Sequence, residues 1–161
     1  MRWQEFVAAC PEFGQLVDAR FRDDQLVLVG TVNRDGWPRI SPCEVDFAAG
    51  ELFLGMMWQS MKALDLLRDP RLLVHSVPSD KDNPGGDIKL YGTAADITDP
   101  ELRRVFREAI LARIDWTPDE PDFHLFALDV DRAAYLRFGG GMTLWQWDAE
   151  RGLRQEERPH G

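Results

Sequence analysis

Ser60 and Lys62 are the residues whose types and spacing most directly suggest binding chemistry. They lie in the stretch GMMWQSMKALDLLRDPR, residues 55–71, where Ser60 precedes a short helical run that Asp69 and Pro70 end. A helix N-terminus presents unpaired N–H groups and a partial positive charge, so a hydroxyl and an ammonium in its first turn suit a phosphate. The alternative is that Ser60 only caps the helix and Lys62 is solvated. The local sequence leaves both interpretations open.

Large, polarisable side chains come directly before this anchor, at Met56, Met57 and Trp58. A planar aromatic ligand needs such an apolar wall beside its phosphate anchor, although core packing explains the same residues. Side chains alternate along a strand, so Met56 and Trp58 are expected on one face and Met57 on the other. One of these faces is therefore expected to meet something other than the core, such as another subunit.

Other residues with chemical potential form weaker patterns. The three histidines, His75, His124 and His160, show no H-x-x-x-H spacing, so no metal site is expected. Cys43 lacks a local partner that would mark it as a nucleophile and is interpreted as a buried thiol. Lys89, inside an expected strand, lies either on a solvated face or toward a pocket.

Composition limits the class of protein. The chain has 161 residues, which favours one domain, and its acidic residues outnumber its basic ones by 28 to 19, a net charge of -9. This balance argues against nucleic acid as a partner but leaves room for a local basic pocket. No apolar run is long enough to span a bilayer, and two cysteines make no disulfide framework. A cytoplasmic protein without membrane contact is expected.

The first half of the chain is expected to position the anchor through a meander. Residues 1–24 are predicted to form a helical segment interrupted at Pro11, packed outside a barrel of residues 25–161. Strands are predicted at 25–32, 38–47 and 52–57, with a hairpin at Asp35 and Gly36. Pro42 removes a ladder donor, so the second strand is expected to be an edge or to be broken there.

The second half continues the β pattern around one long helix. Loops are expected at 78–86 and, rich in acids, at 115–122, and a helix is expected at 98–114. Further strands are predicted at 71–77, 87–97, 123–130, 133–138 and 143–148. The fold class is therefore mainly β, a small antiparallel barrel with helices outside it.

Two segments carry a resemblance to a known family. LVGTVNRDGWPRISPCEV, followed by LFLGMMWQSMKALDLLRDPRLLVHS, resembles the pyridoxamine 5'-phosphate oxidase-like, flavin-binding split-barrel family. That family has a T-V-x-x-D-G-x-P hairpin before a strand and an S-x-K-x-x-x-L-x-x-x-P-R helix, and the match runs over residues 26–97. The resemblance implies a six-stranded antiparallel split barrel, a homodimer, and a flavin or deazaflavin at the subunit interface.

The resemblance also assigns roles to residues. Its cofactor-binding set is Ser41, Pro42, Cys43, Met56, Met57, Ser60, Lys62, Asp87 and Lys89. Its substrate or partner-subunit side is Trp58, Trp145 and Trp147. The helix N-terminus at Ser60 and Lys62 is the implied phosphate site, and no catalytic acid or base is assigned.

This chain departs from the true oxidases at two of these positions. The oxidases carry an arginine where Ser41 stands and another where Met61 stands, both serving the flavin phosphate, and their C-terminal arginine motif is not found. Vitamin B6 oxidation is therefore not expected. The implied function is an oxidoreductase that binds FMN and transfers hydride with a small organic substrate. The alternatives are a reductase using the deazaflavin coenzyme F-420 and a non-catalytic flavin- or heme-binding protein.

Overall fold

The computed structural model describes residues 1–78 and 81–159, so His160 and part of the expected 78–86 loop lie outside the described residues. Two helices come first, α1 (Trp3–Ala9) and α2 (Pro11–Asp24). Pro11 is the first residue of α2, where its missing N–H costs nothing, so one amphipathic stretch becomes two helices. Phe6 and Phe13 are fully buried and attach these helices to the sheet.

The predicted meander consists of β1 (Leu26–Val32), β2 (Pro38–Ala48) and β3 (Glu51–Met57). The side chain of Asn33 accepts hydrogen bonds from the backbone N–H groups of Asp35 and Trp37, both 2.9 Å long, and so shapes the first hairpin. Ala49 and Gly50 turn the second hairpin with φ of 49° and 75°. A left-handed conformation of this kind is what a two-residue hairpin requires.

The expected break of β2 at Pro42 is wrong, because the strand is continuous and Pro42 pairs with Leu28. The pairing of β2 with β3 begins only at Val45, so β2 is an edge at Pro42. A proline is tolerated there because no neighbouring strand needs its missing N–H. The edge part of the prediction thus agrees with the structure.

A long-range pairing closes the barrel. The strands β4 (Arg71–Ser76), β5 (Asp87–Asp96) and β6 (Phe123–Phe138) continue the sheet in the order β3-β2-β1-β4-β5-β6, and β6 returns to pair with β3. The prediction of two strands at 123–130 and 133–138 is wrong, because β6 is one continuous strand. The register of β6 against β5 shifts between Tyr91 and Gly92. The charged residues between the two predicted strands are therefore accommodated by a bulge within one strand, and no gap divides it.

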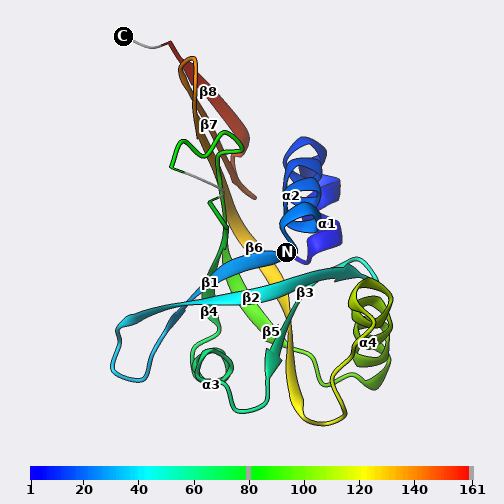
Figure 1. Cartoon of the computed structure of the whole chain (residues 1–161). Coiled ribbons are helices and arrows are strands. Elements are labelled where there is room, and N and C mark those ends of the chain that lie inside the picture. The colour runs from blue at the N-terminus through cyan, green and yellow to red at the C-terminus, as the bar shows by residue number, and fades with distance from the viewer. Residues whose placement is uncertain (79–80, 160–161) are drawn as a thin grey trace.

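The sheet extends past the barrel as a hairpin of β7 (Met142–Asp148) and β8 (Gly152–Arg158), which projects from the body of the molecule in Figure 1. β8 has no counterpart among the predicted strands. Its sequence, GLRQEER, is almost entirely polar and largely exposed, so it carries no alternation of apolar residues.

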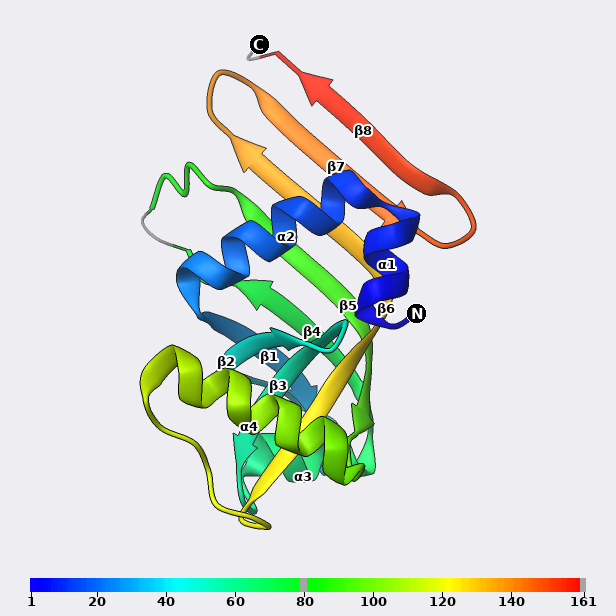
Figure 2. The ribbon, with the colours of Figure 1, turned by 90° about the vertical axis from the view of Figure 1, so that its right-hand side faces the viewer.

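Two further helices cover the outside of the barrel. Figure 2 shows α3 (Met61–Arg68) below the end of the barrel and α4 (Pro100–Ile114) across its lower flank, while α1 and α2 cross the upper sheet. The main core fills the barrel and the space under α1 and α2, and a second core lies under α4. The expected fold class, a closed six-stranded antiparallel barrel with outer helices, is confirmed. None of the described helices has the length and apolar character to cross a membrane.

Candidate functional site

A cavity of about 630 Å³ opens between β2, β3 and α4 and is bounded on its far side by the 116–123 segment. This volume lies in the range of small-molecule sites. Apolar and aromatic side chains form most of its wall: Leu26, Met56, Met57, Trp58, Phe106, Ile110, Trp116 and Phe123. Gly55 lets α4 come this close, because a Cβ there would stand 2.6 Å from the ring of Phe106.

The end of β3 supplies the wall nearest the predicted anchor. Met56 is buried in the barrel, whereas Met57 points outward into the cavity and is 81% exposed, as strand alternation predicts. Trp58 follows the last residue of β3 and does not continue the alternation. Its ring stacks on His124, with centroids 4.6 Å apart and planes 9° apart, and is 51% exposed. Met57 and Trp58 therefore present open apolar surface on the cavity side.

The start of α3 supplies polar groups at the edge of this wall. Ser60 has the extended backbone of a capping residue, but its side chain makes no capping hydrogen bond. Its hydroxyl oxygen is buried and has no hydrogen-bond partner, which is unusual for a buried polar atom. Lys62 lines the cavity, and its Nζ donates to the Pro42 carbonyl at 2.5 Å. The capping role considered for Ser60 is therefore not observed.

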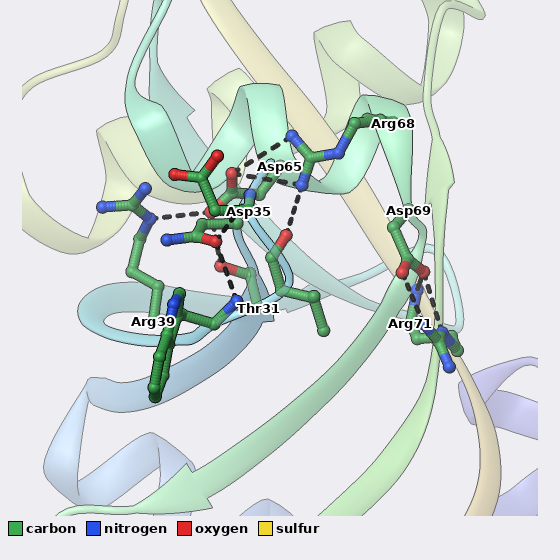
Figure 3. A network of polar contacts seen from close by, with 10 residues as sticks. Thr31, Asp35, Arg39, Asp65, Arg68, Asp69 and Arg71 are labelled. Atoms are coloured by element: carbon green, nitrogen blue, oxygen red, sulfur yellow. Dashed lines mark hydrogen bonds and ion pairs between the residues drawn. The ribbon is translucent and has the colours of Figure 1, made fainter.

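The other half of α3 is fastened to the barrel by a cluster of polar side chains (Figure 3). The Asp65 carboxylate, 2% exposed, accepts hydrogen bonds from Thr31 Oγ1 at 2.9 Å and from Arg39 Nε at 2.7 Å. Arg68 also bonds to Asp65 and donates to the Val32 carbonyl. Burial alone would raise the pKa of Asp65, but the hydrogen bonds from Arg39 and Thr31 outweigh it and lower the pKa.

Acidic residues surround the opposite side of the cavity. Arg113 on α4 bonds to Asp46 at 2.8 Å and to Glu44 at 2.9 Å, which ties α4 to β2. Burial raises the pKa of Asp46, and the Arg113 guanidinium opposes that rise. Asp119 and Asp122 also line the cavity and are exposed. Positive charge therefore reaches the cavity on the side of Lys62, close to the start of α3.

Cys43 belongs to the cavity wall but is not a reactive thiol. Its S–H donates to the Gly55 carbonyl at 3.3 Å, and burial raises the pKa of the thiol to about 12. A thiol with this pKa stays protonated at neutral pH, and nucleophilic chemistry needs the thiolate. Cys43 therefore contributes neutral, polarisable surface.

Half of the sequence-predicted site residues meet at this cavity: Pro42, Cys43, Met56, Met57, Trp58 and Lys62. Ser41 pairs with Val29 and does not line it, and Asp87 bonds to Asn83 at 2.7 Å on β5. Lys89 lies in register with Pro42 across β1 and β4, through Leu28 and His75. It therefore faces the same side of the sheet, three strands away, and does not line the cavity.

Two predicted tryptophans lie far from the cavity in the fold of this chain. Trp147 is buried, with its ring centroid 4.8 Å from that of Phe6. Trp145 packs edge-on against Phe13 and Tyr135, at 5.9 and 5.7 Å. Both rings hold α1 and α2 on the sheet.

Sequence reasoning missed the α4 and 116–123 side of the cavity. Trp116 is an exposed aromatic residue among the acids and prolines of the loop expected at 115–122, and it is a local signal of this side of the cavity. His124 and Phe123 gave no local signal, because their place depends on the pairing of β6 with β3. Among residues 1–78 and 81–159, no group of three or more His, Cys, Asp or Glu side chains could hold a metal ion.

Comparison with known proteins identifies the family of the chain. Residues 13–137 match the family model described as pyridoxamine 5'-phosphate oxidase, and the chain belongs to that family. A search of curated protein sequences finds no match. The resemblance noted from the hairpin and the S-x-K helix is confirmed.

Solved structures show the same fold at low sequence identity. A pyridoxamine 5'-phosphate oxidase-related, FMN binding protein from Nostoc punctiforme is similar with a TM-score of 0.66 and 16% identity, over 93% of this chain and 96% of that one. A heme binding protein from Mycobacterium smegmatis has a TM-score of 0.59 and 14% identity, over 88% and 86%. Campylobacter jejuni ChuZ has a TM-score of 0.73 and 10% identity, over 94% and 63%. Proteins that share this fold thus include one described as FMN binding and one described as heme binding.

Proposed function

We propose that the protein is an oxidoreductase that binds FMN in the cavity and transfers hydride with a small organic substrate. The observation that carries the proposal is the buried, unpartnered hydroxyl of Ser60 at the start of α3, two residues before Lys62, which lines the cavity. Buried polar atoms are normally satisfied, so an orphan at a helix N-terminus suits an anionic ligand group. The FMN-binding relative from Nostoc punctiforme supports the choice of cofactor.

The donor set fits FMN in both of its parts. Ser60, the first N–H groups of α3 and Lys62 would hold the phosphate. Met57 and Trp58 would contact the ring, and Phe123 would help to exclude water from it. Bound FMN would supply hydride chemistry, while this chain binds, orients and shields it.

Heme is the less favoured ligand because nearby iron-binding atoms are engaged. Cys43 lines the cavity, but burial raises the pKa of its thiol to about 12, and an iron ligand must be the thiolate. The Nε2 atom of His124 accepts a hydrogen bond from the Gln59 N–H. A deazaflavin remains the nearest alternative cofactor. Met61 stands where the true oxidases carry an arginine, so Lys62 is the cation that the first turn of α3 provides.

A second copy of the chain is the proposed partner. Trp37 and Ile40 on the first hairpin, Met57 at the cavity and Met61 at the start of α3 are large apolar side chains left exposed. Apolar residues grouped in this way mark association surfaces. Sedimentation velocity tests the proposal: a dimer supports it, and a monomer with bound cofactor would contradict an interface site.

Titration of the purified protein with FMN, deazaflavin and hemin, followed by absorbance and flavin fluorescence, tests the function. We expect FMN to bind at micromolar protein. If hemin binds while both flavins fail, the oxidoreductase proposal is wrong. Once FMN is bound, stopped-flow oxidation of the reduced protein by candidate organic acceptors tests hydride transfer, and oxidation no faster than that of free reduced FMN would leave only a binding role.

A further inference from the structure

His124 lies behind the cavity wall and is not used by the proposed function. It is buried, with 7% of the residue exposed, on β6 opposite Met56 of β3. One aromatic neighbour is Trp58, stacked at 4.6 Å, and another is Phe126, whose ring centroid is 6.3 Å away and nearly parallel. The imidazole is therefore the inner support of the Trp58 ring.

The same imidazole holds the backbone that leads into the anion anchor. The Gln59 N–H donates to His124 Nε2 at 3.2 Å. Gln59 has a φ of 57°, a left-handed conformation that a residue with a side chain adopts only when its surroundings enforce it. The turn it makes joins Met57, the end of β3, to Ser60. One ring thus fixes both the aromatic wall and the approach to the helix N-terminus.

The hydrogen bond defines the protonation state of the ring. Nε2 accepts a hydrogen bond, so it carries no hydrogen of its own, and the neutral ring carries its hydrogen on Nδ1. Burial lowers the pKa of His124, an effect that Asp96 on β5 opposes and Arg103 on α4 reinforces. At neutral pH the geometry and the charges therefore both favour the neutral imidazole.

We propose that His124 is a positioning residue whose neutral ring holds Trp58 and the Gln59–Ser60 turn in the arrangement that receives the ligand, and that its protonation releases them. Protonation places a hydrogen on Nε2, facing the Gln59 N–H, so the acceptor is lost. The turn loosens, and the ring wall and the phosphate anchor are displaced together. Ligand affinity then falls as the pH falls through the pKa of His124, a regulation that rests on the proposed function of the cavity.

The stability of the fold changes with pH in the same direction. His124 binds a proton more weakly in the folded chain than in the unfolded chain, where its pKa is about 6.5. Its neutral form therefore contributes stability that is complete above that pH and is lost as the pH falls through the folded pKa. Asp96 and Arg103 are the charged groups whose fields reach His124 from β5 and α4.

Tryptophan fluorescence of the ligand-free protein tests the device without any cofactor. A protonated imidazole quenches a stacked indole, so emission should fall in a step centred below pH 6.5. The step should be absent in Trp58→Phe and in His124→Gln, whose amide oxygen can accept from the Gln59 N–H but does not titrate. Persistence of the step in either variant would overturn the proposal. If His124→Gln does not fold, Trp58→Phe still tests the proposal, because this variant alters a half-exposed ring.

Affinity for FMN between pH 8 and pH 5.5 provides the second arm. The phosphate of FMN itself titrates near pH 6, so the quantity to compare is the ratio of wild-type to His124→Gln dissociation constants at each pH. We expect this ratio to be near one at pH 8 and to rise at least fivefold at pH 5.5. A constant ratio would refute the link between His124 and the site. Failure of FMN to bind at any pH would refute the proposed function alone, since the fluorescence step is measured without ligand.

Discussion

At its C-terminal half, α3 is fastened by the buried Asp65 carboxylate, which is bonded to Thr31, Arg39 and Arg68. At its N-terminus, the same helix begins with a Ser60 hydroxyl that has no partner and with Met61, which is 58% exposed. The two ends belong to one element of eight residues. One end is therefore satisfied by the fold, and the other has the unsatisfied group on which the proposed ligand role rests.

This contrast shows how a fold can carry an unsatisfied group. Orphan polar atoms cost free energy, and natural structures keep them chiefly at functional positions. The Asp65 cluster fixes the position of α3, so the helix keeps its place without a hydrogen bond from the Ser60 hydroxyl. The following variants test the contrast in order of decreasing expected effect.

Loss of the Asp65 carboxylate should have the largest effect. Asp65→Ala leaves Arg39 and Arg68 without their buried counter-charge, and breaking a buried ion pair typically costs about 3–5 kcal/mol of the free energy of unfolding. Urea denaturation measures this loss. The matched control is Asp69→Ala, which removes a partly exposed carboxylate paired with the exposed Arg71 in the same region of Figure 3 and should change stability far less. Equal losses in the two variants would contradict the anchoring role of Asp65.

Loss of the Lys62 ammonium should affect binding and leave the fold unchanged. Lys62→Ala should weaken FMN binding about tenfold, or roughly 1.4 kcal/mol, because a charge-assisted bond to the phosphate disappears. Its midpoint of urea denaturation should match that of the wild type. Lys81→Ala removes the same charge from an exposed loop residue and should leave the affinity unchanged. Unchanged affinity in Lys62→Ala would return Lys62 to the solvated role considered at first.

A cation added at the start of α3 should strengthen FMN binding. Met61→Arg should tighten FMN binding about fivefold, or roughly 1 kcal/mol, while slightly destabilising the ligand-free protein through the positive end of the helix dipole. Leu67→Arg places the same group on an exposed position in the last turn of α3 and should not change the affinity. Calorimetric titration of both variants gives the comparison, and equal tightening by both would indicate a non-specific effect of charge.

Removal of the orphan hydroxyl should have the smallest effect. Ser60→Ala should weaken FMN binding about threefold, since one hydrogen bond contributes about 0.5–1.5 kcal/mol. The free energy of unfolding without ligand should stay the same or rise, because the buried hydroxyl has no partner to lose. A clear loss of stability in the ligand-free protein would reveal a structural role for Ser60 and weaken the proposed function.

Local signals in the sequence predicted the parts of this site that lie close together along the chain. The turn residues Asn33 to Gly36 set the first hairpin, and Ser60 and Lys62 were recognised because a helix start is a local feature. Alternation correctly separated Met56 from Met57. These features depend on neighbouring residues only, so one segment suffices to predict them.

The features that escaped prediction depend on pairing between distant segments. The single long β6 was divided because the charged residues Asp131 and Arg132 interrupt its apolar pattern, and only the bulge opposite β5 shows that the strand continues. β8 is polar because it is an exposed outer strand. The stacking of His124 on Trp58 follows from the register of β6 on β3, which no local pattern in either strand specifies.

The closing pair, β3 with β6, also has a kinetic consequence. Its partners, such as Phe53 and Ala127, come from opposite halves of the chain, whereas the β1-β2-β3 meander forms from neighbours. Pairings between distant segments form slowly because a long loop must first be closed. Met57 and His124 reach their places only in this step, so the cavity is among the last parts of the molecule to assemble. Ligand binding during refolding would therefore report completion of the barrel.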